Sequence, residues 1–334
     1  MLKSKKINIG ISIGDPNGIG IEIILKVLSE SHLYEKCNFI IYSSLDLIVK
    51  QQDFFKITTL PLKKIDSLDK IVSDHINIKE VFSSSKFEFG KKDKEISANG
   101  IISFKEAVEN AKSKKIDILI TAPINKSLSY SSSFKFSGHT DYLKNTFNKD
   151  PMMLMVSGNL KLGLLTEHIP LKDVVSEITT KKVIQKIKSL TDTLKNDFLI
   201  KAPKIAILAI NPHVGDNGVI GSDDQNILIP AITDLNKDNN LIFGPFSADT
   251  FFCNENHKQY DGIIAAYHDQ GLIPFKTISF GNGVNYSSGL PIIRTSPDHG
   301  TGFDIAGQGI ASTSSFIQAL KVGLDIYKSR NTID

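Results

Sequence analysis

The fold is decided by ANGIISFKEAVENAKSKKIDILI, residues 98–120, which joins a helical pattern directly to a strand-like run. Within it, Ile101, Phe104, Val108 and Ala111 recur at steps of three and four residues, the spacing of a helix with one apolar face. The run 116–120 that follows is mostly apolar over the length of a strand. The stretch therefore predicts a core-facing helix followed at once by a buried strand.

The same alternation of strand and helix extends along the chain. A second helical pattern runs from Val183 to Leu194, and further apolar runs of strand length occupy residues 7–13, 39–42, 152–156, 205–210 and 263–266. Helices between buried strands are typical of mostly parallel sheets, whose ligand sites lie at the carboxyl ends of the strands. The sequence therefore predicts an α/β protein, in which the weakly patterned segment 50–97 is peripheral.

The chain is longer than one typical domain. Its 334 residues exceed the roughly 100 to 200 residues of most domains, which favours two lobes that share a cleft. No long Pro/Gly/Ser linker marks a boundary. We place the first lobe at residues 1–130 with 295–334, and the second, which carries the candidate metal and substrate loops, at residues 131–294.

Charge and cysteine content argue against several classes of protein. The formal net charge is +3 and the lysines are scattered, so binding to nucleic acid is not expected. No apolar run approaches the roughly 20 residues that span a bilayer, and the N-terminus does not resemble a signal peptide. Cys37 and Cys253 are too few for a disulfide framework. We expect a cytoplasmic protein that binds neither membranes nor nucleic acid.

Three of the eight histidines follow strand-like runs: His168 in Leu-Thr-Glu-His, His213 in Asn-Pro-His and His268 in Tyr-His-Asp-Gln. Three neutral imidazoles with an open position suit Zn²⁺ or a similar ion, which would polarise a substrate oxygen. Asp249 and Asp269 are candidates to orient the imidazoles. Because the spacing is long-range, three separately hydrogen-bonded loop histidines are an equal alternative at this point. We expect surface positions for His32, His75 and His257.

Candidate anion-binding groups lie in two other segments. Ser137-Gly-His139-Thr140-Asp141 places an imidazole and a hydroxyl beside a glycine. Further on, Lys276, Asn285 and Arg294 supply a point cation, an amide and a bidentate fork, which suit a phosphorylated, carboxylated small molecule. Arg294 is one of only two arginines, so a need for the fork rather than for charge alone is indicated there. Taken singly, Lys276 as a solvated residue and Asn285 as a turn residue are the alternatives.

Two glycine-rich segments are weaker indications of a nucleotide. Gly14-Asp-Pro-Asn-Gly-Ile-Gly20 follows the first predicted strand, but its glycines lack the GxGxxG spacing, and a structural turn is its expected role. Asp298-His-Gly-Thr-Gly-Phe-Asp-Ile-Ala-Gly307 is a turn-rich loop whose backbone amides suit an anion. Neither segment identifies NAD by itself.

Six motifs taken together resemble the 4-hydroxythreonine-4-phosphate dehydrogenases of pyridoxal phosphate biosynthesis. The resemblance covers residues 7 to about 310 and rests on GDPNGIG (14–20), TAPINK (121–126), GHTD (138–141), NPH (211–213), YHDQGLIPFK (267–276) and NYSSGLPIIRTSPDHGT (285–301). It implies an isocitrate and isopropylmalate dehydrogenase-like fold with two α/β/α lobes around a cleft. It also implies a homodimer with its active site at the subunit interface.

The resemblance assigns roles to the residues singled out above. It implies one divalent ion, Zn²⁺, Mg²⁺ or Co²⁺, on three histidines, one of them from the partner subunit: His168, His213 and His268. It implies substrate binding by His139, Thr140, Lys276, Asn285 and Arg294. The loop after Asp298 is similar to the adenine-side loop of the wider decarboxylating dehydrogenases, which indicates NAD, or NADP, at His299, Gly300, Thr301 and Asp304.

The activity implied is NAD-dependent oxidation of 4-phosphooxy-L-threonine to 2-amino-3-oxo-4-phosphooxybutanoate. Because the carboxylate is then β to the new ketone, the metal can stabilise the enolate as carbon dioxide leaves to give 3-amino-2-oxopropyl phosphate. The proton acceptor stays open between Lys126 and a metal-bound water. Hand-over of the unstable aminoketone to the next pathway enzyme also stays open.

Two alternatives remain. A sister dehydrogenase acting on a four-carbon sugar-acid phosphate would need nearly the same residues. An acyltransferase of the phosphate acetyltransferase type has a related fold but needs neither NAD nor metal, so the three-histidine set argues against it. Departures from the family pattern are small: Asp141 stands where a glutamate is common, and Asp223-Asp224 where a glutamate pair is common.

Overall fold

A computed structural model describes residues 6–30, 36–84, 86–129 and 134–332 of the chain. The chain divides into two compact units: unit 1 comprises Met1–Lys149 with Leu290–Tyr327, and unit 2 comprises Asp150–Gly289 with Lys328–Asp334. The predicted lobe limits were near residues 130 and 295. Residues 134–149 and Arg294, which were predicted in the second lobe, belong to unit 1.

Unit 1 is built on a parallel sheet with the strand order β3-β4-β2-β1-β5-β12. Its described strands are β1 (Ile7–Ser12), β2 (Cys37–Ser43), β3 (Leu62–Ile65), β4 (Ile76–Glu80), β5 (Ile118–Thr121) and β12 (Ile293–Pro297). Its described α-helices are α1 (Gly20–Leu28), α2 (Leu45–Phe55), α3 (Lys94–Lys112), α4 (Lys126–Ser129), α5 (His139–Phe147) and most of α11 (Ser314–Thr332).

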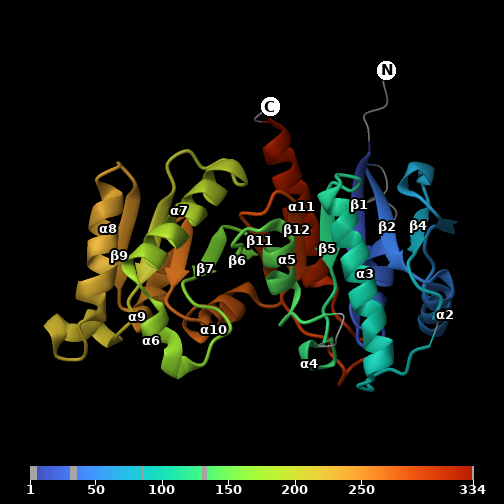
Figure 1. Cartoon of the computed structure of the whole chain (residues 1–334), viewed down its shortest axis with the longest axis horizontal. Coiled ribbons are helices and arrows are strands. Elements are labelled where there is room, and N and C mark those ends of the chain that lie inside the picture. The colour runs from blue at the N-terminus through green and yellow to red at the C-terminus, as the bar shows by residue number, and fades with distance from the viewer. Residues whose placement is uncertain (1–5, 31–35, 85, 130–133, 333–334) are drawn as a thin grey trace. The chain divides into compact units, whose positions relative to one another are not determined.

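Helices cover both faces of the unit 1 sheet (Figure 1). Neighbouring residues of a strand point to opposite faces. In β5, Leu119 joins the core formed with Phe104 and Val108 of α3, whereas Ile118 lies against Gly323 of α11. Unit 1 is therefore an α/β/α sandwich, and the predicted helix and strand in 98–120 are confirmed as α3 and β5.

Unit 2 has a mixed sheet with the strand order β11-β6-β7-β10-β8-β9. Its described strands are β6 (Met152–Ser157), β7 (Leu160–Leu164), β8 (Lys204–Leu208), β9 (Leu241–Phe246), β10 (Gly262–Ala265) and β11 (Val284–Ser288). Strand β6 runs antiparallel to β7 and β11, while the β7–β10, β10–β8 and β8–β9 pairs are parallel. The prediction of mostly parallel sheets is therefore confirmed. The exception is β6, because the turn at Gly158 and Asn159 is too short for a crossover and makes a hairpin.

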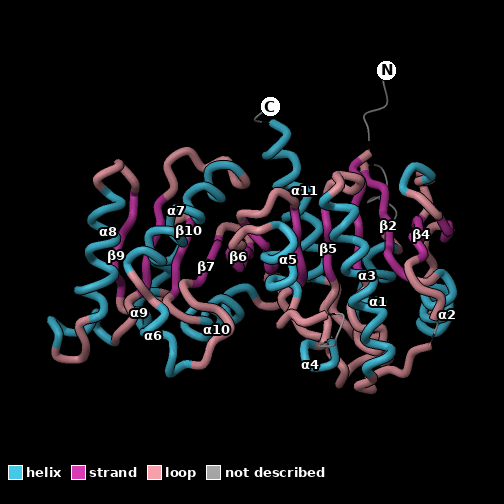
Figure 2. The backbone as a smooth tube through the Cα atoms, viewed as in Figure 1, coloured by secondary structure: helices cyan, strands magenta, loops and turns pink. Residues whose placement is uncertain are grey.

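Helices also cover both faces of the unit 2 sheet. The described α-helices are α6 (Val174–Glu177), α7 (Thr180–Asn196), α8 (Ile229–Asn236), α9 (Ala248–Phe251) and α10 (His268–Ser279). Gly262 of β10 lies against Leu190 and Leu194 of α7, whereas Ala265 lies against Gly271 of α10. Since residues 262 and 265 point to opposite faces, α7 and α10 lie on opposite sides of β10. Figure 2 shows these helices around the strands of unit 2.

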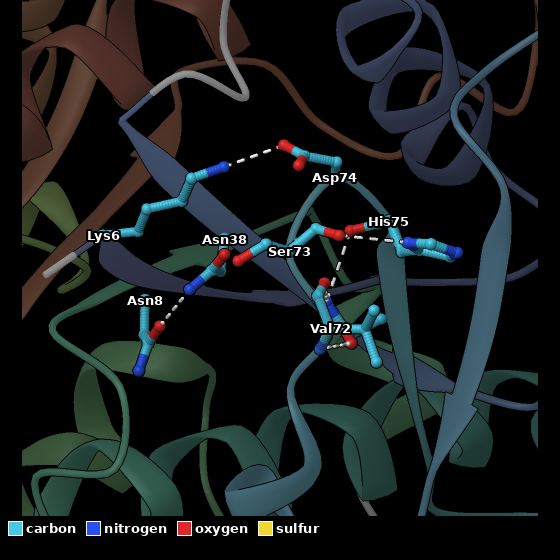
Figure 3. A network of polar contacts seen from close by, with 8 residues as sticks. Lys6, Asn8, Asn38, Val72, Ser73, Asp74 and His75 are labelled. Atoms are coloured by element: carbon cyan, nitrogen blue, oxygen red, sulfur yellow. Dashed lines mark hydrogen bonds and ion pairs between the residues drawn. The ribbon is translucent and has the colours of Figure 1, made fainter. Parts of the chain in front are cut away.

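The segment 50–97 contains more regular structure than the sequence analysis expected. Strand β4 lies inside the sheet between β3 and β2, and Ile76 and Ile78 are fully buried. A polar network fixes the chain before β4 (Figure 3): Lys6 pairs with Asp74 at 2.9 Å, and His75 Nδ1 lies 3.1 Å from the Ser73 carbonyl oxygen. The prediction that this segment is peripheral was therefore wrong for β4.

Among the described helices, none combines the length and the hydrophobicity that a membrane span requires.

Candidate functional site

Arg294 lies in β12 and is almost fully buried, with 2% of its surface exposed. It reaches Thr121, the last residue of the adjacent strand β5, where Nη2 and Nε donate to Thr121 Oγ1 at 2.5 and 3.1 Å. Burial lowers the pKa of Arg294 to about 9. The guanidinium therefore keeps its charge at neutral pH in a fixed, poorly hydrated position, which suits binding of an anion.

His139 lies beside Arg294, with its Nδ1 atom 3.3 Å from Arg294 Nη2. A guanidinium only donates, so Nδ1 is the acceptor and the ring proton is on Nε2. Burial, and then the charges of Arg294 and Lys126, hold the pKa of His139 well below its usual value, so the ring is neutral. Its Nε2 is shielded from solvent and has no hydrogen-bond partner in the protein. A substrate oxygen could accept this hydrogen bond.

His139 is also the first residue of α5, so it lies at the positive end of a helix dipole. Gly138 precedes it with φ 157° and ψ −168°, a conformation that favours glycine. A Cβ atom at 138 would lie 3.4 Å from Lys126 Cε. The Asp141 carboxylate accepts a hydrogen bond from the Ser137 amide at 3.0 Å, which fixes the first turn that carries half-buried Thr140. Unit 1 thus brings Lys126, His139 and Arg294 together, next to Thr140 in the chain, and we refer to these four residues as the candidate anion-binding cluster.

The loop 298–309 of unit 1 is held by the glycine-rich motif at the N-terminus. The amide of Ile19 donates to the Thr301 carbonyl oxygen at 3.0 Å, and a Cβ atom on Gly18 would lie 2.5 Å from the same oxygen. This arrangement fits the structural role expected for residues 14–20. Within the loop, His299 Nδ1 lies 3.0 Å from the Gly300 carbonyl oxygen, and His299 Nε2 is buried without a protein partner. Asp304 contributes its carbonyl oxygen to Gln308 at 2.9 Å.

In unit 2, the three candidate metal ligands follow adjacent parallel strands. His168 follows β7, His268 follows β10 and His213 follows β8, and β10 pairs with both β7 and β8. The carboxyl ends of parallel neighbours lie at one edge of a sheet, so the three segments leave the sheet on the same side. His268 is the first residue of α10 rather than a loop residue, which corrects the sequence analysis.

His168 and His268 share a pocket of about 290 Å³, and their ring centroids are 5.5 Å apart. The pocket is also lined by Glu167, Ile169, Leu171, Val174, Tyr267 and Asp269. The Asp269 carboxylate is 2.7 Å from His268 Nδ1, which leaves His268 Nε2 as the nitrogen for a metal. Two imidazoles, one of them oriented by a carboxylate, are the nitrogen ligands that Zn²⁺ or Co²⁺ prefers.

His213 is exposed and is not among the residues that line this pocket. Across the described part of the chain, no three His, Cys, Asp or Glu side chains come together as a metal site. His168 and His268 are therefore the two predicted ligands that share a pocket in the described part of the chain.

The remaining predicted residues lie on regular elements of unit 2. Lys276 is exposed on α10. Asn285 lies in β11 and is half-buried. Asp249 lies on α9, where its carboxylate accepts a hydrogen bond from Ser247 Oγ at 2.9 Å. The structure gives Asp249 this local partner, so an orienting role toward a histidine stays a prediction.

Two residues near the candidate sites were missed, and one histidine was misread. Thr121 was quoted in a motif but given no role, and Tyr267 was not recognised as a residue lining the histidine pocket. Thr121 could have been recognised from the sequence as a candidate site residue, because it is a hydroxyl residue at the end of a buried strand. His257 was expected at the surface but is 9% exposed, so that prediction was wrong. His32 lies outside the described residues.

Comparison with known proteins places the chain in a family. The family model described as pyridoxal phosphate biosynthetic protein PdxA matches residues 35–323. The chain belongs to the PdxA family. It is 41% identical over 325 residues to a 4-hydroxythreonine-4-phosphate dehydrogenase from a Sulfurihydrogenibium species, a match that covers 97% of this chain and 99% of the relative.

Solved structures agree with the PdxA assignment. A 4-hydroxythreonine-4-phosphate dehydrogenase from Burkholderia phymatum aligns with a TM-score of 0.78 at 31% identity, covering 97% of this chain and 99% of that one. An isocitrate dehydrogenase from Methylococcus capsulatus aligns with a TM-score of 0.50 at 12% identity, covering 97% and 87%. The second likeness concerns the fold alone, and it confirms the isocitrate dehydrogenase-like architecture expected from the sequence.

Proposed function

We propose that this chain catalyses the NAD(P)-dependent oxidation of 4-phosphooxy-L-threonine to 2-amino-3-oxo-4-phosphooxybutanoate, which then loses carbon dioxide to give 3-amino-2-oxopropyl phosphate. Relatives that carry the name 4-hydroxythreonine-4-phosphate dehydrogenase support the substrate. The proposal depends on the pocket that His168 and His268 share, with their ring centroids 5.5 Å apart and the Asp269 carboxylate 2.7 Å from His268 Nδ1. An acyltransferase would have no use for that arrangement.

The anion-binding cluster of unit 1 is proposed to hold the charged groups of the substrate. Arg294 and the Nε2–H of neutral His139 would donate to oxygens of one anionic group, and Thr140 would add a hydroxyl. Lys126 lies beside Gly138 in the same cluster, and its side chain, acting as the uncharged amine, is our candidate to accept the proton of the substrate hydroxyl. In unit 2, Lys276 and Asn285 complete the proposed set of substrate ligands.

The donor set fits the groups that the family implies. We propose that His168, His213 and His268 hold one divalent ion, with Asp269 fixing the tautomer of His268 and Asp249 in an orienting role. The buried, unpartnered His299 Nε2 fits a polar cofactor atom, so His299, Gly300, Thr301 and Asp304 are the proposed NAD(P) contacts. When bound, the ion would stabilise negative charge on the reacting oxygen and NAD(P) would accept the hydride.

A homodimer is part of the proposal. The exposed segment that follows His213 carries two apolar residues, Val219 and Ile220, which are 83% and 46% exposed. Apolar side chains this exposed beside a candidate ligand are what an interface with a second copy would cover. The proposed site would then take a histidine from the partner, and the proposed setting is the cytoplasm.

The test is NADH formation by the purified protein with 4-phosphooxy-L-threonine, before and after chelation and with Zn²⁺, Mg²⁺ or Co²⁺ restored. We expect NADH only when metal is present. A four-carbon sugar-acid phosphate serves as the comparison substrate, and we expect a lower kcat/KM for it. Turnover that survives complete chelation would contradict the metal site, and faster turnover of the sugar-acid phosphate would reassign the substrate.

A further inference from the structure

The loop that carries His213 has an unusual backbone. His213, Val214, Gly215, Asp216 and Asn217 are consecutive residues with φ between 44° and 76°, so they form one turn of left-handed helix. For residues other than glycine this region is sparsely populated, and for a β-branched residue such as Val214 it is an outlier. A turn of this kind persists only where its surroundings determine it.

The entrance of the turn is held by Asp224. This carboxylate is fully buried, and it accepts hydrogen bonds from the backbone amides of Ile210 and Asn211 at 2.7 and 2.9 Å. Its Oδ2 atom also accepts from Asn211 Nδ2 at 3.1 Å. The two amides are those that immediately precede Pro212 and His213. Asp224 therefore fixes the point at which the chain leaves β8 and enters the turn.

The exit of the turn is closed over the same residues. The amide of Ile220 donates to the Gly215 carbonyl oxygen at 3.1 Å, and a Cβ atom on Gly215 would collide with the Gly221 carbonyl oxygen. Gly221 in turn lies against the Asn211 side chain, which Asp224 holds. The loop is thus a closed ring whose entrance and exit both depend on Asn211 and Asp224. His213 projects from this ring into solvent.

We propose that Asp224 is a positioning residue, which holds the left-handed turn and thereby sets the direction of the His213 imidazole toward a metal ion. The proposal rests on the proposed function, because it assumes that His213 is a metal ligand. Asp224 itself faces the backbone and does not touch the ion. Its role is to preorganise a ligand that stands alone on an exposed loop.

Neighbouring Asp223 supplies a matched control. It is half-buried, and its carboxylate accepts a hydrogen bond from Asn211 Nδ2 at 3.1 Å, whereas Asp224 binds two backbone amides as well. Asp223→Asn and Asp224→Asn remove the same charge from adjacent positions. In Asp224→Asn, however, one carboxylate oxygen becomes an NH₂ group that faces a backbone N–H, so one buried donor loses its acceptor.

The experiment is a Co²⁺ titration of the full-length chelated protein, followed by the visible absorption of the bound ion. We expect Asp224→Asn to raise the Co²⁺ dissociation constant about 10- to 100-fold and to change the absorption spectrum, as when a ligand is no longer held in place. Asp223→Asn should stay within about threefold of wild type, since the backbone contacts remain. His213→Ala gives the reference for complete loss of this ligand. Thermal unfolding of each chelated variant checks that it is folded.

The outcomes separate this inference from the proposed function. Wild-type Co²⁺ binding by folded Asp224→Asn would overturn the positioning role and leave the metal site intact. Equal losses in Asp223→Asn and Asp224→Asn would also overturn it, because charge rather than backbone anchoring would then be responsible. Absence of Co²⁺ binding by wild type would overturn the metal part of the proposed function, and the positioning role with it. If Asp224→Asn does not fold, Asp224→Ser takes its place, because a hydroxyl cannot accept from both backbone amides; a loss of affinity is expected, and wild-type affinity would contradict the proposal.

Discussion

At position 294 the protein holds a charge where water cannot easily reach it. Arg294 keeps its proton because a guanidinium is so weak an acid that burial lowers its pKa only to about 9. A lysine at this position would lose its proton more readily and would replace a planar fork with a single point donor. Its contacts with Thr121 and His139 would not both be reproduced.

We predict that Arg294→Lys raises the KM for the phosphorylated substrate about 10- to 100-fold, which corresponds to about 1.5–3 kcal/mol for a lost charge-assisted hydrogen bond. Steady-state kinetics at saturating NAD measure this change. Arg330→Lys, at the other arginine, is the matched control and should leave KM within about twofold. An unchanged KM for Arg294→Lys would remove Arg294 from substrate binding.

Half-buried His139 and buried His257 make the stability of the protein depend on pH. Burial, and then the charges of Arg294 and Lys126, hold the pKa of His139 well below 6.5; burial, and then the charge of Lys258, lowers that of His257. Below pH 6.5 these two imidazoles are therefore protonated in the unfolded chain but stay neutral in the folded protein. The free energy of unfolding consequently falls as pH drops toward the folded-state pKa.

Urea denaturation between about pH 7.5 and 5 measures this dependence. His139→Gln removes one of the two titrating rings and should flatten the decline, and His257→Gln should remove the remainder attributable to that ring. If neither substitution alters the slope, the acid sensitivity arises from other groups and the assignment to these histidines fails.

The sequence did not indicate that two of the predicted site histidines begin helices. His139 and His268 are first residues of α5 and α10, yet the N-cap residues Gly138 and Tyr267 make no side-chain capping bond. Helix starts are recognised from Ser, Thr, Asp or Asn at the cap, and both starts lack that signal. In contrast, α3 begins after Asp93, whose carboxylate accepts from the amides of Glu95 and Ile96.

The end of α11 is held by hydrogen bonds and an ion pair between Arg330, Asp197 and Tyr286. Arg330 donates to the Asp197 carboxylate at 2.7 and 3.2 Å and to the Tyr286 hydroxyl at 2.9 Å, and Tyr286 donates to Asp197 at 2.6 Å. Asp197 is 5% exposed, so loss of its cation leaves a buried charge poorly compensated. We predict that Arg330→Ala lowers the free energy of unfolding by about 2–3 kcal/mol.

Urea denaturation of Arg330→Ala measures this loss. Lys321→Ala, an exposed cation on the same helix, is the control and should change stability by less than about 0.5 kcal/mol. Equal stabilities for the two variants would mean that Asp197 and Tyr286 satisfy each other without the arginine.

For the whole molecule, the sequence predicted the class of fold and the chain order of its elements, because apolar runs and helical periods are local signals. The boundary near residue 130 was placed too early, because α5 joins the core of unit 1 through Tyr142 and Leu143. No linker-like sequence marks the boundary after residue 149. The left-handed turn at His213 was equally hidden, since it depends on Asp224 rather than on the preferences of Val214.

The proposed dimer interface can be tested by substitution of its exposed apolar residues. Val219→Asp and Ile220→Asp place a charge in the exposed apolar segment after His213, so we predict that each shifts the protein from dimer to monomer. Sedimentation velocity measures the change. Lys201→Asp alters an exposed polar residue of unit 2 and should leave the dimer intact. Dimers that persist in both variants would exclude this segment from the interface.

Unit 1 is discontinuous in the chain, whereas the strands of unit 2 lie between residues 152 and 288 without interruption. During synthesis the N-terminal portion of unit 1 leaves the ribosome first, but it lacks β12, the strand that pairs with β5 and carries Arg294. Domains fold as units while the chain emerges. The histidine pocket of unit 2 can therefore form on the ribosome while the candidate anion-binding cluster is still incomplete. Until residue 297 appears, the edge of β5 is open, and the nascent N-terminal half must avoid pairing with other chains at this edge.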